Sequence, residues 1–209
     1  MTISAKTVGI CGTNCYFVTN QDQTVIVDPG DGYEILHQHV KENDYHPVAI
    51  LLTHGHFDHM MSSLELAKEY DIPIYAYEGE VAMVEDVELN LSAQFGTPYV
   101  GRVDRVVKEG EILHLAGLAW KVLFTPGHTS GSVSYYVESE KALFDGDLIF
   151  ARSVGRTDFP TGKEEDLLLS IQNQVFTLPE DVNIFSGHGP VTTVGMEKKL
   201  NMINRYLSL

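Results

Sequence analysis

The stretch Thr53-His54-Gly55-His56-Phe57-Asp58-His59 decides how this sequence is interpreted, because it gathers four metal-ligand side chains within six positions. It follows residues 48–52, a short apolar run that is typical of a buried strand. His54 and His56 alternate, so an extended segment would place both imidazoles on one side. Neutral imidazole and carboxylate are the usual ligands of Zn(II) and related metals. The stretch therefore predicts a metal site, in which Asp58 can be both a helix cap and a ligand.

Length and composition predict one large domain covering residues 1–209. A chain of 209 residues can bury a sizeable core without disulfides, and 44% hydrophobic with 21% charged residues is ordinary for a globular protein. The N-terminus lacks the basic start and apolar core of a signal peptide, and no apolar run reaches the ~20 residues needed to span a bilayer. We therefore expect a cytoplasmic protein without a membrane partner.

The acidic charge argues against a nucleic-acid partner. The chain carries 29 acidic and 14 basic residues, a formal net charge of -15. Non-specific affinity for nucleic acid comes mainly from Lys and Arg that neutralise phosphates, and this chain has few basic clusters. A small-molecule substrate is the expected partner, and the acidity is that of a solvated surface.

Hydrophobic patterns divide the chain into two sets of strands, each flanked by helices. Such an arrangement predicts a layered α/β fold with helices covering the outer faces. In the first part we expect strands at residues 15–19, 24–27, 48–52 and 72–77 and helices at 33–42, 60–70 and 81–84. In the second part we expect strands at residues 105–107, 112–115, 119–124, 132–137, 142–144 and 182–185 and helices at 164–174 and 196–207.

Three further ligand-type residues stand where predicted strands end at glycine. His128 follows Thr125-Pro126-Gly127, Asp147 follows Gly146, and His188 lies in Ser186-Gly187-His188-Gly189-Pro190. Each alone could be an ordinary turn residue. Since strand ends are where α/β folds place their sites, the three together are predicted to complete the site begun by His54.

These motifs resemble the metallo-β-lactamase superfamily, in order and over nearly the whole chain, with Asp28 in Val-Asp-Pro-Gly as the first motif. The resemblance implies an αβ/βα four-layer sandwich with a two-metal site at the edge between its sheets. Asp28 would orient the ligands from outside the metal shell. The implied ligands are His54, His56 and His128 for metal one, Asp58, His59 and His188 for metal two, and Asp147 as the bridge.

A finer resemblance is to the short bacterial glyoxalase II-like hydrolases, carried by residues 125–132, 144–150, 155–159 and 186–190. It implies that two divalent ions, Zn(II) or else Fe or Mn, share a hydroxide that attacks a thioester such as S-lactoylglutathione. Asp58 and Asp147 would be the catalytic residues, with Asp58 positioning the hydroxide. A thiolate, with a pKa of about 8.5, leaves without a strong general acid. Classical glyoxalase II has a further C-terminal helical region that helps hold glutathione, so the thiol stays open.

Three other functions are compatible with parts of this pattern. Persulfide dioxygenases share the implied fold but hold one Fe(II), for which His54, His128 and Asp147 would be the equivalent trio; the retained His188 favours two metals. Nucleases of the superfamily are disfavoured by the net charge of -15. A purely structural zinc site closes at four ligands, fewer than this chain offers.

Several other residues have two possible interpretations. Arg156 could bind a substrate carboxylate through its bidentate fork, or could pair with Asp158 and brace the loop. Cys15 lies in a strand-like segment and is expected to be a small buried hydrophobe; Cys11 is left without a role. Histidines without a turn context are expected on the surface or satisfied in the core: His37, His39, His46 and His114.

Overall fold

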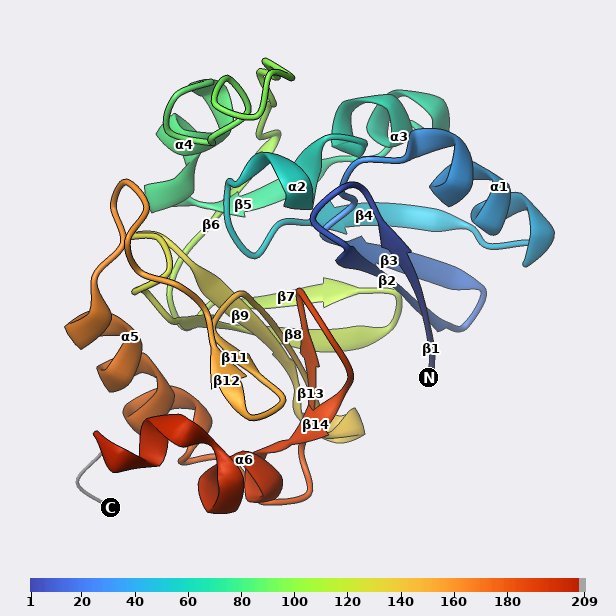
Figure 1. Cartoon of the computed structure of the whole chain (residues 1–209). Coiled ribbons are helices and arrows are strands. Elements are labelled where there is room, and N and C mark those ends of the chain that lie inside the picture. The colour runs from blue at the N-terminus through green and yellow to red at the C-terminus, as the bar shows by residue number, and fades with distance from the viewer. Residues whose placement is uncertain (207–209) are drawn as a thin grey trace.

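Two six-stranded sheets face each other in the computed structural model, which describes residues 1–206 (Figure 1). The first sheet comprises, in spatial order, β1 (Thr2–Val8), β2 (Thr13–Asn20), β3 (Gln23–Val27), β4 (Pro47–Leu51), β5 (Ile74–Tyr77) and β6 (Arg105–Val107). The second comprises β14 (Thr192–Thr193), β13 (Asn183–Ser186), β10 (Ala142–Gly146), β9 (Val133–Val137), β8 (Leu118–Phe124) and β7 (Ile112–Leu115). Each sheet is thus built from one half of the sequence.

Both sheets are mixed. In the first, β1, β2 and β3 are antiparallel, and β3 to β6 are parallel. In the second, β7 to β10 are antiparallel and β13 joins β10 in parallel. A two-stranded ribbon of β11 (Ile149–Phe150) and β12 (Ser153–Val154) follows β10. Parallel neighbours direct their carboxyl ends to the same edge of a sheet, which is where the predicted ligands lie.

Helices cover the outer face of each sheet. α1 (Tyr33–Glu42) and α3 (Ser63–Tyr70) lie on the first sheet, and α5 (Glu164–Ser170) and α6 (Val194–Leu200) on the second (Figure 1). The short helices α2 (Phe57–Met60) and α4 (Val81–Glu85) lie near the edge of the first sheet. The arrangement confirms the predicted α/β four-layer sandwich.

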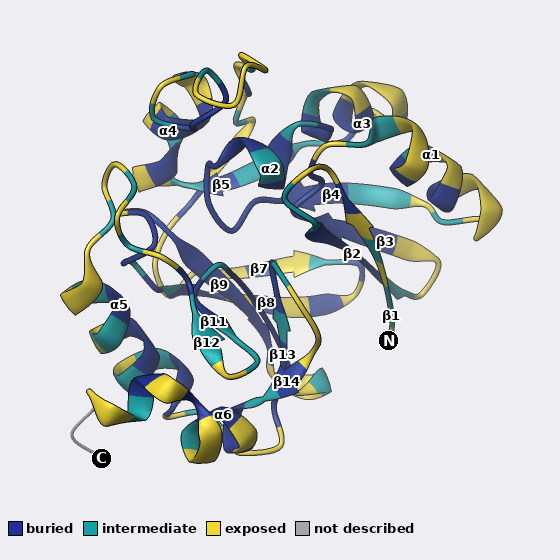
Figure 2. Ribbon diagram, in the orientation of Figure 1, coloured by how far each residue is buried: buried dark blue, intermediate teal, exposed yellow. Residues whose placement is uncertain are grey.

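Three hydrophobic cores hold the layers together, because strands buried on both faces send alternate side chains to opposite sides. In β3, Val25 and Val27 enter the core between the sheets, whereas Ile26 packs against α1 and α3. In β10, Phe144 enters the central core and Leu143 the core beneath α5 and α6. Figure 2 shows this pattern, with buried residues along the sheets and exposed residues on the outer turns of the helices.

The helix predicted at residues 60–70 is wrong in its extent: the structure has two helices, α2 (Phe57–Met60) and α3 (Ser63–Tyr70). The break is at Ser62, whose backbone N–H donates to the Pro29 carbonyl and whose hydroxyl donates to the Gly30 carbonyl. These bonds tie the chain to the loop after β3. They interrupt the helix, so that α2, which carries Asp58 and His59, is separate from α3.

The C-terminal helix predicted at residues 196–207 is also different. α6 ends at Leu200, and a 3-10 turn, Met202–Arg205, follows. Asn201 separates them, because its side chain accepts from the Ile203 N–H and so caps a new turn. The predicted end at residue 207 lies outside the described residues. The helix at 164–174 has nearly the expected length, but its second half, Ile171–Val175, is a π-helix.

Within residues 1–206, the structure contains no helix that is both long and apolar enough to cross a membrane.

Candidate metal centre

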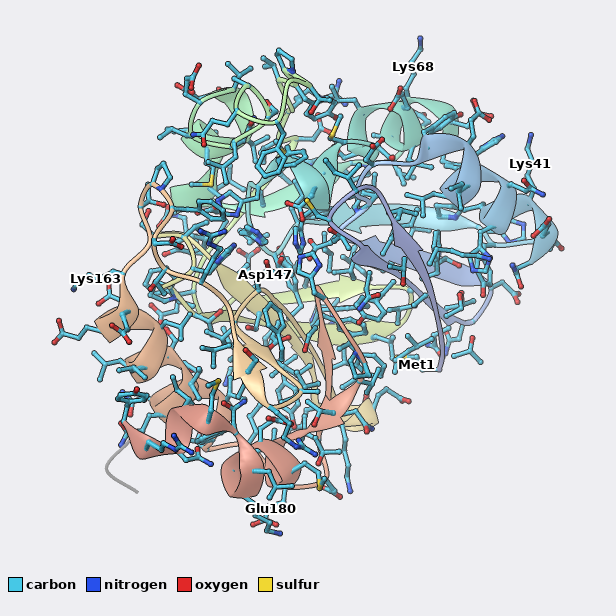
Figure 3. The ribbon with its side chains drawn as sticks, viewed as in Figure 1. Met1, Lys41, Lys68, Asp147, Lys163 and Glu180 are labelled. Carbon is cyan, nitrogen blue, oxygen red and sulfur yellow. The ribbon has the colours of Figure 1, made fainter. Side chains whose placement is uncertain are left out.

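All seven predicted ligands lie at the carboxyl ends of four strands. The loop after β4 carries His54 and His56 and runs into α2; His128 follows β8, Asp147 follows β10, and His188 follows β13. Since β4 belongs to one sheet and the other three strands to the second, the loops meet at the seam between the halves. Figure 3 shows the labelled Asp147 near the middle of the molecule, while Lys41, Lys68 and Lys163 extend from its periphery.

The ligand-type atoms form three overlapping triads, in each of which the atoms lie within 4.8 Å of one another. The first and third match the two metal shells implied by the sequence. The second shares His54 with the first and His59 with the third, and adds Asp147, so it joins them. The triads are His54, His56 and His128; His54, His59 and Asp147; and Asp58, His59 and His188.

Asp28 orients two of the imidazoles. Its Oδ2 lies 3.0 Å from Nδ1 of His59 and accepts a 2.7 Å bond from the hydroxyl of Thr53. With its proton given to Asp28, the Thr53 oxygen can accept from Nδ1 of His54, 3.1 Å away. Both rings then carry their proton on Nδ1, which leaves Nε2 free as a metal ligand. These contacts are of the kind that the orienting role implied for Asp28 by the resemblance would need.

His128 and His188 are held by the backbone of other loops. Nδ1 of His128 lies 2.7 Å from the carbonyl oxygen of Arg156, which fixes the proton there and leaves Nε2 towards Asp147 Oδ2 at 3.5 Å. Asn14 in β2 donates to the carbonyls of Ser186 and Gly189, on either side of the loop that carries His188. A strand of the first sheet thus fixes a ligand loop of the second.

Gly187 allows the closest packing in the centre. A Cβ at this position would lie 2.3 Å from Asp147 Oδ1 and 2.5 Å from His59 Cε1, distances at which those side chains would have to move. Only a residue without a side chain permits the loop to pass here. The glycine in the Ser-Gly-His motif is thus required by the ligands themselves.

Burial keeps two histidines of the first triad, His54 and His56, neutral, which is the form that binds metal. It lowers the pKa of His56 to about 3 and that of His54 well below its usual range. For His59 and His188 burial also lowers the pKa, but the carboxylates of Asp147 and Asp58 outweigh it and raise the pKa, for His188 to about 9. The metal-free centre therefore pairs protonated imidazoles with carboxylates, and a cation would displace those protons.

The carboxylates show the complementary shifts. Burial alone would raise the pKa of Asp58, but the adjacent His59 charge and the hydrogen bonds to His188 and Thr13 together outweigh it and lower the pKa to about 2. Burial would also raise the pKa of Asp147, but the His59 charge and the hydrogen bonds to His188 and His59 together hold it well below its usual range. Both side chains are therefore anionic at neutral pH, as ligands of a divalent cation must be.

Buried ligand atoms without partners indicate that the donor set suits metal ions. Buried polar atoms are almost always hydrogen-bonded, because leaving one unpaired is costly. Six buried side-chain atoms of the described residues have no such partner, and four of them belong to residues of the triads. These four are His54 Nε2, His56 Nε2, His59 Nε2 and Asp147 Oδ1. Nitrogen and carboxylate donors of this kind fit Zn(II), Fe(II) or Mn(II).

The centre opens into a cavity of about 400 Å³. Its polar lining consists mainly of five predicted ligand side chains, together with Cys11 and Ser153; the five are His56, Asp58, His128, Asp147 and His188. The remaining lining is mostly apolar and comes from three segments far apart in the sequence. It comprises Phe57, Leu91, Phe95, Phe150, Val154 and Phe159, with Arg156.

Arg156 adopts the bracing arrangement of its two predicted roles. Its Nε and Nη2 form 2.6 and 2.7 Å bonds to the two carboxylate oxygens of Asp158, and its guanidinium lies 3.9 Å from the centre of the Phe159 ring. Through its carbonyl it also holds His128. Arg156 also lines the cavity.

The cysteines and remaining histidines lie as follows. Both cysteines are free; Cys15 is fully buried, as expected of a structural residue, and Cys11 lines the cavity. His39 is buried and bonded to Ser4 and Asn43, so it is satisfied in the core. Away from the centre lie His37, His46 and His114, of which the last two are exposed.

Two supporting residues were missed in the sequence. Thr13 donates a 2.8 Å bond to Asp58 Oδ2, and Glu80 accepts bonds from both loops of the first triad. Neither belongs to a motif of ligand residues. Each comes from a strand or turn distant in sequence, so only the folded chain reveals the contact.

Comparison with known proteins agrees with the geometry. Residues 8–188 match the metallo-beta-lactamase superfamily. The chain is 39% identical to a probable metallo-hydrolase, YqgX, of Bacillus subtilis over 93% of each sequence. It is 35% identical to the hydroxyacylglutathione hydrolase GloC of Haemophilus influenzae, over 90% of this chain and 91% of that protein.

Two solved structures are similar over the full fold. BLEG-1, described as a B3 metallo-beta-lactamase, superposes with a TM-score of 0.93 at 38% identity and covers 97% of this chain and 99% of its own. TTHA1623, solved in a di-iron-bound form, gives a TM-score of 0.87 at 33% identity and covers 96% of this chain and 99% of its own.

Proposed function

The chain belongs to the metallo-beta-lactamase superfamily, and from that premise we propose that it is a dinuclear metal-dependent hydrolase of thioesters, with S-lactoylglutathione as the first substrate to test. The observation that carries the proposal is the joining of two ligand triads through His59, His54 and Asp147. The likeness to a di-iron structure supports two ions, and Zn(II) remains the ion we expect because the donors are mainly imidazole.

Two ions held by these triads would supply a hydroxide at neutral pH and polarise the carbonyl that it attacks. The residues of the chain determine the geometry. Asp58 is fixed through one oxygen by the hydroxyl of Thr13, so its carboxylate is positioned for a water as well as for an ion. Asp147 lies between His59, His128 and His188, at 3.3 to 3.5 Å from their Nε2 atoms, as a bridging ligand would.

The lining of the rest of the cavity supports a thioester substrate. Cleavage of a carbon–sulfur bond releases a thiolate with a pKa of about 8.5, which leaves without a proton. The apolar lining, including Phe95 and Phe159, suits the acyl and methylene groups of such a substrate. The relative GloC, named for hydroxyacylglutathione, is matched over 91% of its own length, so an added glutathione-binding region need not be assumed.

The test is hydrolysis of S-lactoylglutathione by protein reconstituted with Zn(II), Mn(II) or Fe(II), followed through loss of the thioester absorbance. We expect turnover with two ions per chain and none after chelation. A panel of acyl-coenzyme A and other acyl thioesters would identify a different thiol carrier. Absence of turnover on the whole panel, with two ions bound, would reject the thioester assignment.

The same metal-loaded protein also distinguishes two alternative functions. A persulfide dioxygenase would use one Fe(II) held by His54, His128 and Asp147, and it would consume oxygen with glutathione persulfide. That scheme leaves His188 and Asp58 without a purpose, although they lie 3.5 Å apart in the third triad. A β-lactam belongs in the panel because BLEG-1 is described as a β-lactamase, and its hydrolysis would show that the cavity accepts a cyclic amide.

A further inference from the structure

Glu80 is a buried carboxylate beside the metal centre that none of the ligand motifs includes. It ends a 3-10 turn, Glu78–Glu80, between β5 and α4, and its exposed fraction is 1%. Carboxylates are rarely buried to this extent unless they are paired. No positively charged side chain of the described residues forms an ion pair with it, so its partners must be hydrogen-bond donors.

Three donors converge on Glu80, and they come from the two loops that carry the first triad. Oε2 accepts a 2.6 Å bond from the backbone N–H of Gly55, which lies between His54 and His56. Oε1 accepts 2.9 Å bonds from the Thr129 hydroxyl and the Gly131 N–H, just after His128. Each oxygen of one carboxylate thus holds one loop.

We propose that Glu80 is a positioning residue that sets the spacing between the two loops bearing His54, His56 and His128, and so the affinity of the first triad for its metal ion. The inference rests on the proposed metal site but concerns a residue that makes no contact with the ion. Hydrogen bonds to a charged acceptor are stronger than neutral ones, which suits a contact that must fix backbone.

The packing around Glu80 shows that the loops meet this segment closely. A Cβ on Gly131 would lie 2.6 Å from Glu80 Oε1 and 2.7 Å from the Gly79 carbonyl carbon. A Cβ on Gly55 would lie 2.9 Å from Cγ of Met83. Both loops therefore rest directly on residues 79–83, and the distance between them cannot be changed without moving this segment.

The protonation of Glu80 agrees with a specific role. Burial raises the pKa of Glu80 to about 7, although the bonds from Thr129, Gly55 and Gly131 each lower it. A buried anion at this position thus lowers the stability of the fold, whereas an apolar side chain of similar size would not lower it. A residue present only for packing has no need of the charge, whereas two backbone N–H groups and a hydroxyl require an acceptor.

The variant Glu80→Gln tests the proposal with almost no change in shape. Whichever way the amide is turned, its NH2 group meets a backbone N–H, that of Gly55 or that of Gly131. The experiment titrates the metal-free, full-length protein with Co(II) at pH 8, where Glu80 is ionised, and follows the visible absorption of the bound ion. The matched control is Glu78→Gln, an exposed glutamate in the same turn.

We expect E80Q to bind one of the two Co(II) ions about 10- to 100-fold more weakly, as removal of an orienting contact does elsewhere, and to change its absorption spectrum. E78Q should match the wild type. The same titration in His188→Ala, in which the third triad is disrupted, gives the spectrum of the ion held by His54, His56 and His128. Comparison with that spectrum shows whether this is the site weakened in E80Q. Wild-type affinity and spectrum in E80Q, or an equal loss at both sites, would overturn the proposal.

A second variant covers the case in which E80Q does not fold. Thr129→Val removes only the side-chain donor and keeps both backbone bonds, so a smaller weakening of the same site is expected; no change would overturn the proposal. A wild-type protein that binds no Co(II) would instead reject the metal site itself. Absence of Co(II) binding in the wild type thus counts against the proposed function, whereas unchanged binding in the variants counts against the role of Glu80 alone.

Discussion

Oδ2 of Asp28 lies 3.0 Å from Nδ1 of His59, and this contact determines which ring nitrogen of His59 faces the metal centre. His59 belongs to two of the three ligand triads, so its orientation affects both. Asp28 also accepts bonds from the backbone and the hydroxyl of Thr53, the residue before His54. One carboxylate outside the triads therefore fixes the histidines of both proposed metal shells.

Asp28→Asn should weaken metal binding without removing a ligand. An amide can place its NH2 group towards His59 or Thr53, which are donors to the native carboxylate, and the loss of such a contact typically lowers metal affinity 10- to 100-fold. Competition with a fluorescent zinc chelator measures the change. Asp31→Asn, on the exposed side of the same loop, is the control and should retain native affinity. Equal affinities for both variants would contradict the orienting role.

His188→Ala should reduce the bound metal from two ions per chain to one. His188 contributes to the third triad only, and its Nε2 lies 3.5 Å from Asp58 and 3.4 Å from Asp147. Hydrolysis should fall by at least about 100-fold, since both an ion and the positioned nucleophile depend on this triad. Metal analysis after gel filtration gives the stoichiometry, with the exposed His114→Ala as control. Two ions retained in H188A would argue against the assigned shells.

The pH dependence of stability should reveal the raised pKa of Glu80. Its pKa is about 4.5 as a free side chain and about 7 in the folded protein, where burial dominates. Between these values the folded state keeps a proton that the unfolded chain has lost. The contribution of Glu80 to the free energy of unfolding is therefore greatest below pH 4.5 and decreases as the pH rises through 7, by on the order of 3 kcal/mol.

Urea unfolding of the metal-free wild type and E80Q at pH 5 and pH 8 measures this effect. The wild type should lose stability relative to the variant as the pH rises, because Gln does not ionise. The difference between the two proteins cancels the other titrating groups. If it is constant with pH, Glu80 ionises in the folded state as it does in water, and the burial shift is absent.

Trp120→Ala should be among the most destabilising substitutions in the central core. Trp120 is fully buried between the sheets, packs on Phe144 with ring centres 5.5 Å apart, and donates a 3.2 Å bond to the Leu115 carbonyl. Large-to-small changes of buried aromatic residues cost about 3 to 5 kcal/mol. Since the chain has 1 tryptophan, unfolding should be followed by circular dichroism. A loss below about 1 kcal/mol, comparable to the half-exposed Val106→Ala, would contradict this core assignment.

The fold was predictable to the extent that it depends on side-chain periodicity. The helix at Tyr33–Glu42 and the strands at Arg105–Val107 and Ile112–Leu115 have the expected bounds, because each presents a clear apolar pattern. β1 was missed, since an edge strand with polar and charged side chains lacks such a pattern. β14 and the ribbon of β11 and β12 were missed because two residues are too few to show alternation.

The residues of the centre could be predicted where they stand in a recognisable motif, as the ligand-type residues and Asp28 do, and could not where supporting residues lack one. His128, Asp147 and His188 stand out because each follows a strand and a glycine, and the structure brings all three to the first motif. Glu80 and Thr13 give no such signal, because their role depends on loops that meet only in the folded chain. Likewise, the sequence left open both roles of Arg156, and its pairing depends on the conformation of one loop.

The division of the ligands between the two sheets has a mechanical consequence. His56 and His128 are 72 residues apart and lie on loops of different halves, yet their ring nitrogens approach to 2.9 Å. An ion held by both would cross-link the chain reversibly and close a long loop, which restricts the unfolded ensemble much as a disulfide does. Chelation would then do more than abolish catalysis. It would remove the metal cross-link between the two halves, and local unfolding would begin where the loops of the two sheets meet.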